Sequence, residues 1–194
     1  MRMCGMMLFL SIACVLFMPG CNEDTCPECV EDTGTLYPCL VSEEESQQYE
    51  GEQDGAGQRG WNTLPGLEQD VLTVINETRR TLGLCPVYTD ACLREVARAH
   101  SREMAANAYC DHVDLSGERV SDRLDAAGIP WVKCGEILGC QEPGADLVET
   151  VVAAWMISQA HRDTILNCQY THTGIGICTD REGLYYLTVV FAAF

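Results

Sequence analysis

The chain has 194 residues, 13 cysteines and a formal net charge of −17. This length corresponds to one ordinary domain with additional segments. Residues 22–70 hold 13 acidic residues against Arg59 alone, a net charge of −12, whereas residues 71–194 hold 16 acidic and 10 basic residues, a net charge of −6. Because no basic patch is present, the composition excludes a nucleic-acid partner and predicts repulsion from anionic surfaces.

The N-terminus has the pattern of an export signal. Arg2 provides a short positive region, and residues 6–18 form an apolar segment that is too short to span a membrane. Pro19 and Gly20 end this segment before Cys21, as in a bacterial lipoprotein signal. We therefore predict a signal peptide over residues 1–20, lipidation of Cys21 and a membrane anchor through that lipid. Cys14 is a weaker lipidation candidate, and a plain secretory signal cleaved near Cys21 is the other interpretation, so the protein is expected to be a cell-envelope lipoprotein or secreted.

The cysteine count supports export. Two cysteines leave with the signal, and lipidation of Cys21 would leave ten, an even number that allows five disulfides. Each bridge typically stabilises a small domain by ~2–4 kcal/mol, and such density indicates an oxidising compartment. Seven cysteines lie in the second part of the chain, so either a bond joins the two parts or one thiol stays free. The disulfide candidates there are Cys85, Cys92, Cys110, Cys134, Cys140, Cys168 and Cys178.

Residues 21–62 are acidic and poor in apolar side chains, which predicts a disordered tether. Cys26 and Cys29 form a CxxC pattern in this segment. A disulfide is the favoured interpretation, because neither a βαβ context nor a second CxxC at zinc-ribbon spacing accompanies it. The folded domain is predicted at residues 63–194.

Helical periodicity dominates the first half of this domain. Apolar residues recur at helical spacing over 67–82, and Gly83 follows as a natural stop. A second helix is predicted to start near Thr89-Asp90, and a short third helix spans 121–127. His100 lies on the apolar face of the second helix, which favours a buried histidine hydrogen-bonded to the backbone over a ligand.

The second half changes from helix to strand. Residues 131–140 are compatible with a strand or a loop, and a helix opened by Pro143-Gly144 extends to Leu166. Residues 172–179 and 184–191 then follow a period of two and predict two strands, joined by a turn at 180–183. The order of elements predicts an α+β domain that ends in a hairpin.

The histidines are the main candidates for chemistry. His112 lies in a polar loop, His161 at the polar end of the last helix and His172 at the start of a strand, while Glu136 follows a glycine between two cysteines. Imidazole and carboxylate groups can bind a zinc-like divalent cation or perform acid–base work. Their spacing matches no short metal or nucleophile motif, so the pattern alone favours scattered surface histidines.

Several motifs, taken in order, resemble the CAP superfamily of cysteine-rich secretory proteins, antigen 5 and pathogenesis-related class 1 proteins, in its bacterial type. The resemblance covers about residues 67–194. It is carried by residues 99–104, His112, Arg123, Ala127-Gly128, Gly135-Glu136, 155–158, His161-Arg162, Ile165-Leu166, 174–176, Tyr185-Tyr186 and Phe191.

This resemblance implies an α-β-α sandwich with a central, largely antiparallel sheet, stabilised by disulfides. It also implies a cleft whose first histidine is His112, whose glutamate is Glu136 and whose second histidine is His172. The second acid of eukaryotic members would fall near Ser158 and is absent, and His161 is the candidate to replace it. These four residues form a predicted divalent-cation site, weighed equally against a hydrogen-bonded relic without a ligand.

Three functions remain open at this stage. The favoured one is a surface-tethered binding module that recognises a metal, a lipid or sterol, or an extracellular protein. The alternative is a metal-dependent, peptidase-like hydrolase that uses His112, Glu136 and His172. The third is a disulfide-hardened envelope protein without a small ligand. No catalytic residue is assigned, and the balance is against an enzyme, because no serine lies in a recognisable nucleophile motif.

Overall fold

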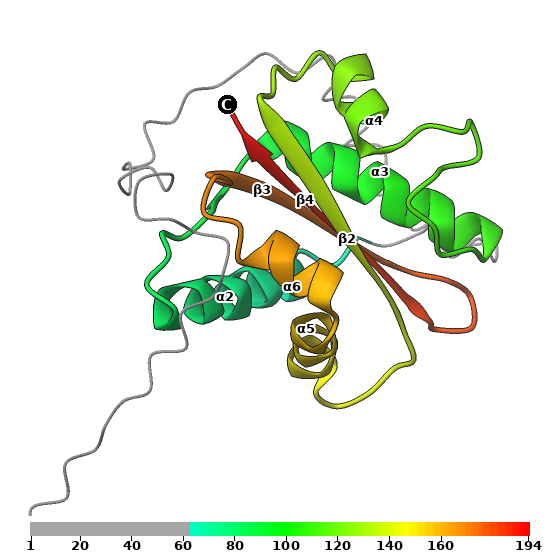
Figure 1. Ribbon diagram of the computed structural model, residues 1–194. Coiled ribbons are helices and arrows are strands. Elements are labelled where there is room, and N and C mark those ends of the chain that lie inside the picture. Colours follow the sequence, from blue (N-terminus) through cyan, green and yellow to red (C-terminus); the bar gives the residue numbers. More distant parts are fainter. Residues whose placement is uncertain (1–62) are drawn as a thin grey trace, which may run out of the picture.

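The computed structural model describes residues 63–194 and shows a four-stranded sheet between two helical layers (Figure 1). β4 pairs antiparallel with both β2 and β3, and the two-residue β1 pairs parallel with β3. The predicted α+β class and the sandwich architecture are therefore confirmed. In the order β1–β3–β4–β2, the strands span Tyr88–Thr89, His172–Thr179, Tyr185–Ala193 and Lys133–Gln141.

The helices divide between the two faces of the sheet (Figure 1). α3 and α4 cover one face, and α2, α5 and α6 cover the other, each layer enclosing its own apolar cluster. The site described below depends on residues from both layers. The helices span Pro65–Thr81 (α2), Ala91–Asn107 (α3), Val120–Ala126 (α4), Leu147–Ile157 (α5) and Gln159–Ile165 (α6).

Local sequence signals account for the ends of the first helices. α2 begins with Pro65 at its first turn, where a missing N–H costs nothing, and Gly83 adopts φ +75° just after its end. Asp90 caps α3 by accepting a hydrogen bond from the Leu93 N–H at 2.8 Å. The first two predicted helices are confirmed, and α4 lies where the short third helix was predicted.

The long helix predicted from 143 to 166 is in fact two helices. Ser158 has extended backbone (φ −73°, ψ 121°) and separates α5 from α6. The buried stripe of α5 ends at Trp155. Most residues just beyond it are exposed, so a straight continuation of the helix would bury little further apolar surface against the sheet. The break turns α6 in a new direction and so decides where His161 lies.

α3 lies unusually close to the sheet. Gly174 and Gly176 of β3 face it, and a Cβ atom at either position would collide with the backbone of α3. Only glycine permits this approach, which brings the helix backbone directly onto the strand. On the other layer Arg79, fully buried, donates hydrogen bonds to the carbonyls of Cys85, Ile165 and Asn167, and so ties α2 to the end of α6.

The predictions for the signal peptide (1–20), for Cys21 and for the tether (21–62), including its CxxC, lie outside the described residues. Among residues 63–194, no helix has the length and apolar character needed to cross a bilayer.

Candidate functional site

The candidate site is built around one buried carboxylate. Glu136 lies on β2 opposite Val190 of β4, and its side chain, 2% exposed, points toward the layer of α3 and α4. One carboxylate oxygen lies 2.8 Å from His112 Nδ1, and the other accepts a hydrogen bond from Arg123 Nη2 at 2.6 Å. Both oxygens of Glu136 are therefore engaged within the protein.

His112 is the exposed member of this group, with 45% of its side chain accessible. Since a carboxylate only accepts hydrogen bonds, Nδ1 carries the proton and Nε2 is left as the acceptor of the neutral ring. A carboxylate that fixes the tautomer and orientation of an imidazole is a common support for a binding or catalytic histidine. The arrangement presents a positioned histidine at the surface.

Arg123 of α4 holds the loop that carries His112. Its guanidinium also donates to the Glu118 carbonyl at 3.0 Å and lies 3.4 Å from the Asp114 carboxylate. Asp114 in turn accepts the backbone N–H groups of Ser116 and Glu118. Burial alone would raise the pKa of Asp114, but these donors together with Arg123 lower it below its ordinary value.

His161 of α6 belongs to the same neighbourhood, although it comes from the opposite layer. Burial lowers its pKa, and the positive charge of a protonated His112 lowers it further. His161 lies on α6, and His112 precedes α4; in Figure 1 the two helices lie on opposite sides of β2. Ser158, where the missing acid was expected, serves as the junction between α5 and α6 and makes no side-chain capping bond.

His172 lies apart from these residues. It pairs with Ala192, so it is two strands away from β2, roughly 10 Å across the sheet. Its Nδ1 lies 2.9 Å from Thr171 Oγ1, and its ring packs 4.9 Å from the Phe194 ring. The structure therefore brings His112 and Glu136 into contact, links His161 to them only through its electrostatic interaction with His112, and leaves out His172.

Within residues 63–194, no group of three or more His, Cys, Asp or Glu side chains is placed to hold a metal ion. A catalytic zinc ion commonly has three protein ligands, and both Glu136 oxygens are already engaged by His112 and Arg123. The two imidazoles of His112 and His161 are too few to form such a site by themselves.

The comparison with known families now has a structural context. The profile of the cysteine-rich secretory protein family, CAP, matches residues 72–191, which is more than half of the chain. The chain belongs to the CAP family. Its bacterial character is supported by YkwD of Bacillus subtilis (strain 168), 34% identical over 115 residues, which are 59% of this chain and 44% of that protein.

A second curated relative and two solved structures are also similar to this chain. The membrane protein YlbC of Bacillus subtilis (strain 168) is 32% identical over 119 residues, 61% of this chain and 32% of its own length. The CAP chain thus spans less than half of the curated relatives that it matches. A structure of an extracellular SCP-domain protein from Bacillus anthracis is 25% identical with a TM-score of 0.58, covering 67% of this chain and 41% of that one. An outer surface protein of Borrelia burgdorferi, 20% identical with a TM-score of 0.62 over 69% of this chain and 98% of its own, shares the fold.

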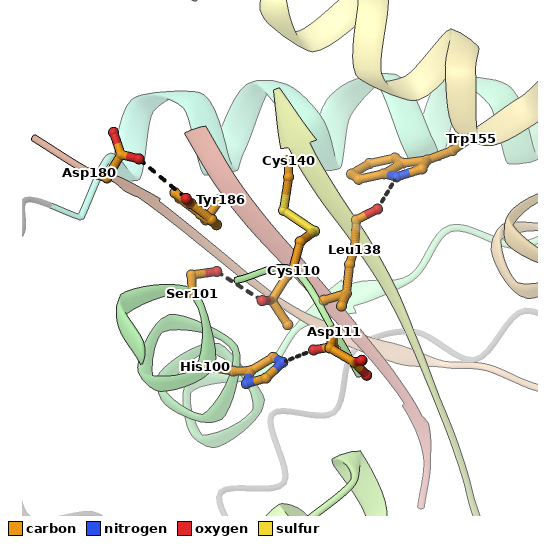
Figure 2. The surroundings of a disulfide bond; sticks show 10 residues. His100, Ser101, Cys110, Asp111, Leu138, Cys140, Trp155, Asp180 and Tyr186 are labelled. Atoms are coloured by element: carbon orange, nitrogen blue, oxygen red, sulfur yellow. Dashed lines mark hydrogen bonds between the residues drawn. A yellow bond between two sulfur atoms is a disulfide. The ribbon is translucent and has the colours of Figure 1, made fainter. Parts of the chain in front are cut away.

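His100 plays the structural role that its apolar position predicted. It is 2% exposed, and its Nε2 donates to the Asp111 carbonyl at 3.0 Å, so it holds the chain that leaves α3 toward His112 (Figure 2). Burial and the nearby Arg123 lower its pKa. The prediction of a buried histidine bonded to the backbone is confirmed.

The cysteines of the CAP domain fall into two groups. Cys110, two residues before His112, forms a disulfide with Cys140 of β2 (Figure 2). Cys134 and Cys178 are thiols, in contrast to their prediction as disulfide candidates. They face Ala192 and Tyr186 of β4, six residues or roughly 20 Å apart along the strand, which is too far for a bond between them. Cys85, Cys92 and Cys168 are disulfide-bonded, as predicted.

A groove of about 400 Å³ lies elsewhere, between α2, the start of α5 and the start of β4. Its lining contains two carboxylates, Asp70 and Glu149, and no histidine. It is therefore separate from the site at His112.

Arg123 and Asp114 are the functional residues that pattern reasoning missed. Arg123 appeared only as a residue shared with the family, and Asp114 only as part of a polar loop. The one available signal was the glycine-ended polar loop itself, since an aspartate there tends to accept the backbone N–H groups that follow it. That Arg123 reaches Glu136 depends on how α4 packs on β2, which no local pattern contains.

Proposed function

We propose that this CAP protein is an exported binding module that recognises its ligand at the surface formed by His112 and His161 over β2. One observation carries the proposal: Glu136 is buried and uses both oxygens to hold Arg123 and His112, whereas His112 itself is 45% exposed. The carboxylate is thereby a positioning group, and the accessible side chain is an imidazole suited to contact a ligand.

The same geometry gives little support to hydrolysis. Among residues 63–194, no serine, threonine or cysteine side chain hydrogen-bonds to His112, so no activated nucleophile accompanies it. A metal-activated water would need a third protein ligand that the described residues do not bring to the site. Export is proposed from the signal-like N-terminus and the cysteine content, together with relatives described as extracellular or outer surface proteins. Lipidation of Cys21 would hold the domain at the membrane, which mass spectrometry of the mature N-terminus tests.

The binding proposal is tested with the full mature chain and three probes: zinc chloride, phosphatidylglycerol vesicles and a panel of short blocked peptides. His112→Ala should weaken the binding of at least one probe by tenfold or more. His172→Ala is the matched control, because it also removes an imidazole but lies two strands from β2, and it should stay within about twofold of the wild type.

Three results would overturn the proposal. The first is equal affinity of both variants for every probe, and the second is no binding of any probe by the wild type. The third is hydrolysis of casein that is lost with a chelator and with Glu136→Gln, which would make the protein a metal-dependent hydrolase.

A further inference from the structure

The outer edge of β2 carries the inference. β2 is the last strand of the sheet formed by residues 63–194, so half of its backbone groups point away from β4. Two side-chain hydrogen bonds identify the residues whose backbone groups point outward. The Cys134 carbonyl accepts from Tyr170 Oη at 3.0 Å, and the Leu138 carbonyl accepts from Trp155 Nε1 at 2.7 Å. Groups at every second residue point the same way, so the N–H and C=O of Glu136, between these two, also face outward.

The opposite strand agrees with this assignment. The carbonyl of Val190, which faces Glu136 across the ladder, accepts a hydrogen bond from Thr173 Oγ1 of β3 at 2.8 Å. Val190 therefore directs its backbone toward β3 and not toward Glu136. Glu136 and Val190 form a pair without mutual hydrogen bonds, which leaves the Glu136 backbone free to bind on the outside.

Exposure at Glu136 is confined to its backbone. The residue as a whole is only partly buried, although its side chain is 2% exposed. Water therefore reaches the main chain of Glu136, and no hydrogen bond within residues 63–194 occupies its outward N–H or C=O. The capped carbonyls of Cys134 and Leu138 limit the open part of the edge to about three residues.

Exposed apolar side chains occur in the segments next to β2. Residues 63–194 expose four large hydrophobic side chains, and three of them belong to segments beside β2. Leu115, 64% exposed, lies in the loop that Arg123 ties to Glu136; Ile157, 83% exposed, precedes the break before α6; and Val132, 79% exposed, immediately precedes β2. The fourth, Leu82, lies at the end of α2 in the other part of the domain.

The geometry points to an extended peptide segment as the occupant of this edge. Resting on the proposed binding function, this inference names its partner class: a stretch of about three residues that adds beside β2 and exchanges two main-chain hydrogen bonds with Glu136. Because side chains of an added strand alternate, those on one side meet Leu115 and His112, and those on the other meet Ile157 and His161. A partner with apolar side chains at these positions satisfies both the backbone and the rim.

The test uses nuclear magnetic resonance with the full mature chain, labelled with ¹⁵N. The probes are acetylated, amidated heptapeptides that carry Val, Leu or Phe at alternate positions and Thr or Lys between them. The best binder should shift the Glu136 amide resonance and slow its hydrogen exchange. N-methylation of the peptide nitrogen that faces β2 should weaken binding at least tenfold, whereas methylation of the next nitrogen, which faces away, should change it less than threefold.

Variants of the rim give a second readout without disturbing the core. Ile157→Lys and Leu115→Lys should each weaken the peptide about tenfold, and Leu82→Lys, the same type of change at an exposed position far from β2, should leave its affinity unchanged. The inference is overturned if no peptide binds below about 1 mM, if both N-methylated isomers bind alike, or if Leu82→Lys is as damaging as Ile157→Lys. Binding of zinc or vesicles that needs His112, without peptide binding, would keep the binding function and reject the peptide.

Discussion

The two edges of the sheet differ in how the protein treats their backbone. At the β3 edge, β1 pairs with the start of the strand, Thr63 bridges to Cys178 near its end, and Glu68 lies 3.4 Å from the Ile177 N–H between them. At the β2 edge only two carbonyls are satisfied within residues 63–194, and a side chain supplies each bond. Within residues 63–194, one edge is covered by other segments and the other edge is left accessible.

The closed edge contains contacts that stabilise the fold, and the open edge contains the residues proposed to bind a partner. Behind the closed edge, Glu68 forms a bidentate ion pair with Arg98 of α3, with contacts of 2.7–3.2 Å. The open edge is anchored by the disulfide between Cys110 and Cys140 and carries the exposed His112. An edge with free backbone groups can pair with the strands of other chains, so proteins usually cover such an edge unless it binds a partner.

The largest effect is expected beside the closed edge, at Gly176. Valine there would drive its side chain into the backbone of α3, and we expect a loss of about 4 kcal/mol or more in the free energy of unfolding. Gly144→Val is the control, since nothing lies within 4 Å of its added Cβ and its φ is not positive. Urea denaturation measures both variants, and equal stability would show that α3 does not depend on this close contact.

The disulfide should be the next strongest contribution, and it belongs to the open edge. Replacing Cys110 and Cys140 by serine together releases a loop closed over a sequence separation of 30, which should cost roughly 3–4 kcal/mol. Cys134→Ser, which alters a thiol outside any bond, should change stability by less than about 1 kcal/mol. A matching small loss in the double variant would mean that the open edge does not need its covalent anchor.

The ion pair of the closed edge should contribute somewhat less. Glu68 is 5% exposed, and Glu68→Gln removes the closer of the two carboxylates that pair with Arg98 and leaves only Glu95 at 3.2 Å, which should cost about 2 kcal/mol. Adding Arg98→Met should recover part of this loss, because the guanidinium charge that Glu95 alone compensates is then removed. A double variant that is less stable than Glu68→Gln would contradict this explanation.

The smallest effect is a pH dependence that originates behind the open edge. Burial and Arg123 hold the pKa of His100 below 6.5, although Glu136 and Glu103 act in the opposite direction. Below pH 6.5 the unfolded chain then binds more protons than the folded one, so the free energy of unfolding falls as the pH decreases. His100→Gln should flatten part of this decline, measured by urea denaturation at a series of pH values below neutrality, and His161 contributes in the same direction. An unchanged slope in His100→Gln would exclude His100 as its source.

Much of the fold was predictable from local pattern. The apolar stripes of α2, α3 and α5, the cap at Asp90 and the period of two in β3 and β4 each reflect short-range physics, and the structure contains all of them. The break at Ser158 was not predicted, because no glycine or proline marks it in the sequence, and the end of the buried stripe at Trp155 is visible only in the packing against the sheet.

The candidate site was predictable only in part. His112 and Glu136, which resemblance to the CAP family suggested, do contact each other. His172 was grouped with them from the same resemblance, but the strand order places it two strands away. Strand order is a long-range property, so no spacing along the chain could have separated His172 from His161.

The sequence by itself determined most of the helices and strands and the family of this protein, because periodicity, helix caps and shared motifs depend on residues that are close together in the sequence. Only the tertiary structure decided which strand lies at the edge, that Arg123 and His112 divide the oxygens of Glu136, and that Cys134 and Cys178 lie too far apart to bond. These features arise where segments distant in sequence pack together. The open edge of β2 is one of them, since its accessibility depends on which strands the described residues 63–194 pair beside it.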